Sequence, residues 1–154
     1  MEVLSFPTIL ILGYGNSLRS DDAAGRQVAE KIAQQQWQNV QSLSLHQLTP
    51  ELAETLSQAQ AVIFVDVIAS QALTITVEPL EPTAISNNWS HAADPRSLLA
   101  LAQTLYGKAP PAWWVLIPGV NFAIGEALSK VTQAGVLEAI KAIKQLVDSI
   151  IESR

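Results

Sequence analysis

Residues 8–22 read TILILGYGNSLRSDD, and this stretch decides the fold. The continuous apolar run at its start is typical of a strand that is buried on both faces of a parallel sheet. The glycines on either side of Tyr14 allow the backbone to turn sharply and to approach a ligand closely. Asp21 or Asp22 can then cap a helix that runs to about Gln36. The stretch therefore predicts a strand, a loop and a helix, the first unit of an α/β protein.

A dinucleotide-binding loop is one interpretation of these glycines, and it is the weaker one. Such a loop needs a third glycine three positions after Gly15, where the chain has Leu18. It also needs an acidic residue after the next strand to hold a ribose, and the chain has His46 there. A nucleotide-binding α/β domain therefore remains only a minor alternative.

The rest of the chain alternates between strand and helix patterns. Helices are predicted after Thr49-Pro50, after Asp94-Pro95 and, at the end, over residues 136–151, where apolar residues recur at helical spacing. Further strands are predicted at Val40–His46, Ala61–Asp66, Leu73–Val77 (an edge strand) and Trp113–Pro118. This alternation predicts one three-layer, doubly wound domain over residues 1–154, with a mostly parallel sheet of about five strands and helices on both faces.

Composition narrows the range of functions. The chain has 154 residues, 49% of them hydrophobic, which suits one sizeable core. It has no cysteine, which excludes disulfides, thiolate zinc sites and a cysteine nucleophile. The net charge of -5, with only nine Lys and Arg, argues against nucleic acid as a partner. With no apolar run of roughly 18 residues and no basic leader, we expect a cytoplasmic monomer that does not enter a membrane.

Three side chains are the candidates for chemistry: Asp22, Asp66 and His91. Asp22 follows the first strand, Asp66 ends the predicted strand 61–66, and His91 lies in a long polar loop predicted over residues 78–93. Each has an ordinary explanation, as a helix cap, a turn residue or a loop histidine. If the two strands are neighbours, however, both carboxylates face one crevice at the carboxyl edge of the sheet, and His91 can reach it. Carboxylates and an imidazole suit nickel, zinc, manganese or iron, with positions left open for water or substrate.

Other polar and aromatic residues carry weaker signals. His46 is the only other histidine, and we expect a structural role, with contact to a partner as the alternative. Trp113 and Trp114 point to opposite faces of their strand, so one ring should fill the core while the other lies nearer the surface. A serine triad is disfavoured, because the chain has no Gly-x-Ser-x-Gly motif.

The order of these motifs resembles that of the hydrogenase maturation endopeptidases. The segments that carry the resemblance are GYGNSLRSDD at 13–22, Val65-Asp66, and Ser90-His91 followed by Pro95, and they extend over nearly the whole chain. The segments HQLTPEL at 46–52 and AWWVLIP at 112–118 look most like the branch that serves cyanobacterial bidirectional, NAD(P)-linked [NiFe] hydrogenases. The chain departs from the family in having Asp22 where many members have glutamate, and Ala23-Ala24-Gly25 where glycine, an apolar residue and glycine are common.

The resemblance implies an endopeptidase that removes a C-terminal extension from the precursor of the hydrogenase large subunit after nickel has been inserted. It assigns the metal-contacting and catalytic roles to Asp22, Asp66 and His91. The nickel would be carried by the precursor, as a recognition signal, and would not be a permanent cofactor of the protease. A chaperone that binds the nickel-loaded subunit without cutting it is the alternative.

Overall fold

The computed structural model of the chain describes residues 8–83 and 94–153 and contains a five-stranded sheet. Its strands are β1 (Ile9–Tyr14), β2 (Val40–Leu45), β3 (Ala61–Ala69), β4 (Thr76–Leu80) and β5 (Ala112–Gly119). They lie in the order β2-β1-β3-β5-β4. All neighbouring strands are parallel except β4, which runs antiparallel to β5 at the edge of the sheet. The predicted fold class, a mostly parallel sheet of about five strands, is confirmed, and the edge strand predicted at Leu73–Val77 corresponds to β4.

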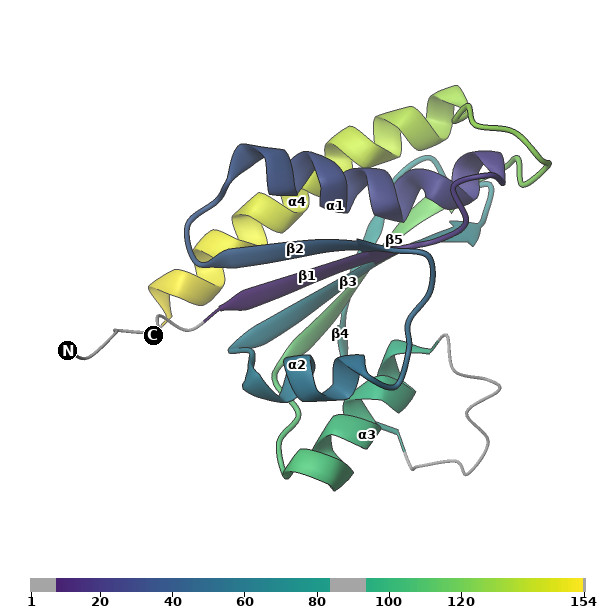
Figure 1. Cartoon of the computed structure of the whole chain (residues 1–154). Coiled ribbons are helices and arrows are strands. Elements are labelled where there is room, and N and C mark those ends of the chain that lie inside the picture. Colours follow the sequence, from purple (N-terminus) through teal and green to yellow (C-terminus); the bar gives the residue numbers. More distant parts are fainter. Residues whose placement is uncertain (1–7, 84–93, 154) are drawn as a thin grey trace.

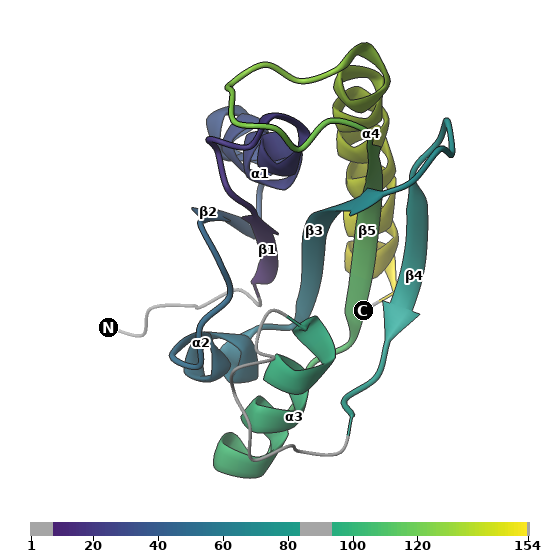
Figure 2. The ribbon, with the colours of Figure 1, turned by 90° about the vertical axis from the view of Figure 1, so that its right-hand side faces the viewer.

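Helices cover both faces of this sheet (Figure 1). On one face lie α1 (Ala24–Gln35) and the long closing helix α4 (Lys130–Glu152). On the other lie α2 (Leu52–Gln58) and α3 (Pro95–Tyr106). In Figure 2, turned by 90°, α1 lies above the strands and α2 and α3 lie below them, while α4 overlaps β5. None of the helices in the described part of the chain is long and apolar enough to span a membrane.

Alternation along the strands divides the interior into two cores. Ile9 and Ile11 of β1 pack toward α1 and α4, whereas Leu10, Leu12 and Tyr14 pack toward α2 and α3. Because β1 and most of β3 are covered on both faces, these central strands are almost entirely apolar, as expected for a parallel sheet. The two tryptophans of β5 follow the same rule: both are partly buried, Trp113 against the first core and Trp114 against the second. The expectation that only one ring would pack inward was therefore wrong.

Several element boundaries differ from the sequence prediction. β3 continues for three residues beyond Asp66, because its partner β5 extends equally far and keeps the backbone paired. β4 begins at Thr76 rather than Leu73 and takes in residues 78–80, which were expected to belong to a loop. Helix α2 begins at Leu52, after a turn in which Thr49 and Pro50 accept backbone hydrogen bonds, so Thr49 is not its cap. At α3 the prediction holds, since the Asp94 side chain accepts from the Arg96 N–H and Pro95 is the first helical residue.

The strand order places a topological switch between β1 and β3. From β1 the chain crosses through α1 to β2 on one side, and it then returns through α2 to β3 on the other side of β1. Loops that leave two such strands diverge, and the crevice between them is where α/β proteins bind ligands. The sequence predicted that Asp22 and Asp66 would face one crevice only if their two strands are neighbours. The pairing of β1 with β3 meets this condition.

Candidate active site

Asp22 is held at the end of the loop that leaves β1. The loop closes through a short 3-10 helix at Ser20–Ala23, and the Asn16 N–H donates to Asp22 Oδ2 at 2.7 Å. Gly15, at φ 151°, lies directly beneath this residue, and a Cβ there would come within 2.0 Å of the Asp22 carbonyl oxygen. Only glycine allows this close approach. The glycine loop therefore fixes the direction of the Asp22 carboxylate, which is partly buried.

Asp66 lies on β3 beside the point where β1 ends. Its Oδ1 accepts the N–H of Val67 at 2.7 Å. Burial raises the pKa of Asp66 to about 6, and the negative charge of Asp22 adds to the rise, although the hydrogen bond from the Val67 N–H and the nearby Tyr14 hydroxyl oppose it. The two carboxylates are thus near enough to influence each other. A carboxyl group that titrates near neutral pH can either accept a proton or bind a cation.

Tyr14 and Trp114 form the buried surroundings of Asp66. Burial raises the pKa of the Tyr14 hydroxyl far above its ordinary value, and the charge of Asp66 raises it further, so the hydroxyl keeps its proton and can act as a donor. The Trp114 indole also interacts with this hydroxyl. Neither residue was predicted to belong to the site, although the alternation of side chains along each strand places both on the same face as Asp66.

Asp21, the neighbour of Asp22, has a different role from the one predicted. Neither aspartate caps α1, which has no side-chain cap. Asp21 is instead fully buried and accepts four hydrogen bonds from the segment between β5 and α4: from the N–H groups of Val120, Asn121 and Ser129 and from the Ser129 hydroxyl, at 2.7–2.9 Å. Burial alone would raise the pKa of Asp21, but these donors together outweigh it and hold the pKa below its usual value.

The backbone around Asp21 joins the glycine loop to the same segment. Ser20 has a left-handed φ of 52° and is held there by bonds from its N–H to Gly125 O at 2.8 Å and from its hydroxyl to Ala123 O at 2.7 Å. The Gly125 N–H donates back to Leu18 O at 2.9 Å. Figure 2 shows this segment, in light green, passing over the start of α1. Asp22 is therefore carried by a loop that is fixed at both ends.

His91 lies outside the described residues, so its predicted place in the site stays a prediction. Within residues 8–83 and 94–153, no group of three His, Cys, Asp or Glu side chains is arranged to hold a metal ion. The described carboxylates Asp22 and Asp66 thus need a further ligand from elsewhere to complete such a set. His46 follows β2 and is exposed, which does not support a role in packing.

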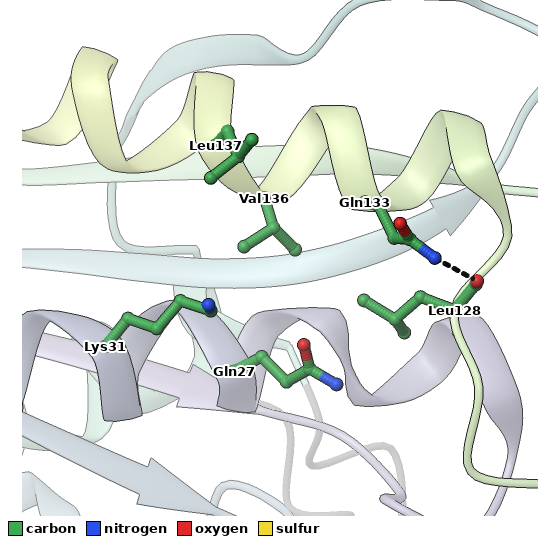
Figure 3. Close-up of a pocket in the computed structure, with 6 residues that line it drawn as sticks. All are labelled: Gln27, Lys31, Leu128, Gln133, Val136 and Leu137. Atoms are coloured by element: carbon green, nitrogen blue, oxygen red, sulfur yellow. Dashed lines mark hydrogen bonds between the residues drawn. The ribbon is translucent and has the colours of Figure 1, made fainter.

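Two surface pockets can be compared with the position of the candidate site at Asp22 and Asp66. One lies between α1 and α4, where Figure 3 shows Lys31 and Gln27 across from Val136 and Leu137, with Gln133 Nε2 donating to Leu128 O at 2.9 Å. It has no carboxylate in its lining and lies away from the switch point. The other is at the carboxyl ends of β3 and β5 and is lined by Ala69, Ser70, Gln71, Gly119, Val120 and Phe122. The second pocket is therefore on the same edge of the sheet as the candidate site.

The chain has the fold of the [NiFe] hydrogenase maturation proteases, as comparison with solved structures shows. The hydrogenase maturating endopeptidase HybD from E. coli is 22% identical over 95% of this chain and 93% of its own length, with a TM-score of 0.74. The maturation protease HybD from Thermococcus kodakarensis is 20% identical over 90% and 98%, with a TM-score of 0.69. The hydrogenase 2 maturation peptidase from a Thaumarchaeota archaeon is 18% identical over 91% and 97%, with a TM-score of 0.69. No protein-family model and no curated protein sequence matches the chain.

Proposed function

We propose that the protein is an endopeptidase that removes the C-terminal extension of a [NiFe] hydrogenase large-subunit precursor after nickel insertion. The observation that carries the proposal is the pair Asp22 and Asp66, one in the loop that leaves β1 and the other on the neighbouring strand β3, with the charge of Asp22 adding to the rise in the pKa of Asp66. Similarity of fold to proteins described as hydrogenase maturation proteases supports it. The motifs at 46–52 and 112–118 further favour the precursor of a bidirectional, NAD(P)-linked hydrogenase as the substrate.

In this proposal the nickel belongs to the substrate and acts as a docking signal. Asp22, Asp66 and His91 supply two carboxylates and an imidazole, a donor set that suits nickel. Three side-chain ligands leave coordination positions for the groups of the precursor, and docking of the ion places the scissile bond beside the aspartates. A precursor without nickel lacks this contact and is not held in place.

Two routes to hydrolysis are compatible with this arrangement. In one, Asp66 takes a proton from water as the water adds to the scissile carbonyl carbon, and the proton then passes to the departing amine as the C–N bond breaks. The pKa of Asp66, about 6, suits this exchange near neutral pH. In the other, the nickel ion polarises the scissile carbonyl and the aspartates only hold the ion. Both routes require the carboxylate of Asp66.

A chaperone that binds the nickel-loaded subunit without cutting it would use the same ligands. The two functions differ in what happens to the precursor. On incubation with this protein, the mass of the precursor falls by that of its extension if the protein is a peptidase, and it stays unchanged if the protein is a chaperone.

The decisive experiment compares nickel-loaded and nickel-free precursor at equal concentration. We expect cutting of the loaded form only. His91→Ala and Asp66→Asn should each abolish or greatly slow the cutting, because the first removes a ligand and the second removes the negative charge that attracts the ion. His46→Ala is the matched control for the histidine, since His46 is exposed and is not part of the proposed ligand set.

Asp22→Glu provides a finer test of the same site. Many hydrogenase maturation endopeptidases, which this chain resembles, have glutamate at this position, so the variant should keep its activity. Cleavage of nickel-free precursor, or full activity of His91→Ala toward the loaded precursor, would show that the three residues are not the working site.

A further inference from the structure

Strand register brings Tyr14 next to Asp66. Gly13 of β1 pairs with Val65 of β3, so the next residue of each strand, Tyr14 and Asp66, lie side by side. Tyr14 shares a face with Leu10 and Leu12, and Asp66 shares the same face with Phe64, because side chains alternate along a strand. Phe64 in turn pairs with Trp114 of β5, which places the indole diagonally from Asp66. Three polar groups therefore meet on one face of the sheet, close to the switch point.

Two of these groups are buried donors that have no hydrogen-bond partner among residues 8–83 and 94–153. Tyr14 is only 4% exposed. Among the described residues, neither its hydroxyl nor Trp114 Nε1 forms a hydrogen bond of ordinary geometry, although the hydroxyl is within interaction range of both the indole and Asp66. Buried polar groups without partners are costly and rare in folded proteins, so such a pair beside a candidate catalytic carboxyl calls for an explanation.

The hydrogen bonding of the Asp66 carboxyl group suggests a role for the Tyr14 hydroxyl. One of its oxygens, Oδ1, is held by the adjacent Val67 N–H. That single bond leaves the carboxyl plane able to rotate, because no other described donor has a hydrogen bond of ordinary geometry to Asp66. A second donor on the other oxygen would fix the plane, and the Tyr14 hydroxyl is the adjacent candidate.

We propose that Tyr14 is a positioning residue for Asp66, donating its hydroxyl hydrogen to the carboxylate both in the free protein and when the ion or the substrate is bound, with the Trp114 N–H donating to the Tyr14 oxygen. The inference rests on the proposed function of the site. Partners that orient a metal-binding carboxylate in this way contribute to affinity without touching the ion. The hydroxyl acts as a neutral donor and does not give up its proton.

The start of α3 keeps the indole in place. The guanidinium of Arg96 lies 5.7 Å from the centre of the Trp114 ring. Asp94, the cap of α3, accepts from the Arg96 backbone N–H at 2.9 Å and forms an ion pair with its side chain at 3.3 Å. The ring is thus covered by a cation that is itself tied to the helix start, so rotation of the indole away from Tyr14 is resisted.

The test is Tyr14→Phe, with Tyr106→Phe as the matched control, because Tyr106 is 48% exposed at the end of α3. We expect Tyr14→Phe to weaken Ni²⁺ binding by about 10- to 100-fold in calorimetry. It should also lower kcat/KM for nickel-loaded precursor, since both docking through the ion and orientation of the scissile bond depend on the Asp66 carboxylate. The control should match the wild type in both, and thermal unfolding should show that both variants are folded.

Trp114→Phe tests the second link in the same chain of donors. It removes the indole N–H while keeping an aromatic ring, and we expect a smaller loss of Ni²⁺ affinity than in Tyr14→Phe. Because the indole acts through the hydroxyl, the double variant should bind Ni²⁺ no more weakly than Tyr14→Phe alone. Fully additive losses would overturn the relay from Trp114.

A separate readout distinguishes failure of this inference from failure of the proposed function. The carboxyl-carbon NMR signal of Asp66, measured without metal or precursor, should shift in Tyr14→Phe and stay in place in Tyr106→Phe. A wild-type protein that neither binds Ni²⁺ nor cuts the precursor would overturn the proposed function, while this signal would still report the contact. An unchanged Asp66 signal, or wild-type Ni²⁺ affinity in Tyr14→Phe, would overturn the positioning role.

Discussion

At the scale of single residues, the adjacent aspartates Asp21 and Asp22 have different roles. The Asp22 carboxylate is partly buried and accepts the Asn16 N–H, whereas Asp21 is fully buried and accepts four hydrogen bonds from residues 120–129. A buried carboxylate is stable only when its oxygens are fully satisfied, and here three backbone N–H groups and one hydroxyl satisfy it. Asp21 is therefore a structural residue that holds the Asp22 loop in place.

Asp21→Asn should lower the free energy of unfolding by about 3 kcal/mol. The amide has one acceptor oxygen instead of two, and its NH₂ group would face donors, so buried N–H groups lose their partner. Asp148→Asn is the control, because Asp148 forms only an exposed ion pair with Lys144 and should cost under about 1 kcal/mol. Urea denaturation at pH 7 measures both. Equal losses in the two variants would contradict the role of Asp21.

The same residue predicts how stability changes with pH. The pKa of Asp21 is lower in the folded protein than in the unfolded chain, so its contribution is fully present above the unfolded value of about 4. That contribution is lost as the pH falls through the lower, folded pKa. The difference in unfolding free energy between wild type and Asp21→Asn should therefore be constant from pH 7 to pH 5 and should shrink below about pH 4. A difference that grows toward acid pH would refute this.

At the scale of elements, the unit made of β1, its loop and α1 depends on a close approach of helix to sheet. A Cβ at Gly25, in the first turn of α1, would lie 2.5 Å from Val65 O and 2.8 Å from Tyr14 O. Both atoms belong to strand backbone, which cannot move without disturbing the sheet. Gly25, the last residue of Ala23-Ala24-Gly25, is therefore the glycine that this packing requires.

Gly25→Ala should destabilise the protein by about 2–3 kcal/mol, since α1 must move away from β1 and β3. Gly135→Ala in α4 is a matched control. Its Cβ would meet a side-chain methyl of Ile117 at 2.7 Å, and the gain in helix propensity, up to about 1 kcal/mol, offsets part of the strain. Urea denaturation of both variants should show the larger loss for Gly25→Ala, and the reverse order would contradict the backbone contact.

At the scale of the whole molecule, exposed apolar residues gather near the candidate site. Leu18 in the glycine loop and Val120 and Ile124 in the segment after β5 are 58%, 55% and 86% exposed. The hydrogen bond from Gly125 N to Leu18 O brings these two loops together. Exposed apolar surface of this kind is typical of a contact with another protein. We expect the large-subunit precursor to make that contact.

Ile124→Asp should raise KM for nickel-loaded precursor about tenfold, a loss of about 1.4 kcal/mol in binding, without changing stability. Leu137→Asp is the control, because Leu137 is 66% exposed but lies on α4 beside the pocket between the helices. Steady-state cleavage assays measure both. A KM that is unchanged by Ile124→Asp, or is raised equally by Leu137→Asp, would place the contact elsewhere.

Much of the fold and part of the site followed from the sequence, because they depend on local patterns. Continuous apolar runs predicted β1, β3 and β5. Asp94-Pro95 predicted the start of α3, because a cap and a first-turn proline act within one helical turn. Asp22 and Asp66 could be placed on the carboxyl edge for the same reason. The predicted ends of the strands were less accurate. β3 continues beyond Asp66 because its backbone stays paired with β5 as far as Ala69.

Only the tertiary structure decided which of these groups meet. The adjacency of β1 and β3 depends on the route of the chain around β1, which local pattern does not encode. Asp21 and Asp22 are the same residue type side by side, and the donors that separate their roles lie about 100 positions away in the chain. The meeting of Tyr14, Asp66 and Trp114 requires the register of three strands at once. The sequence by itself determined the elements and their polar ends, and long-range packing selected the partners.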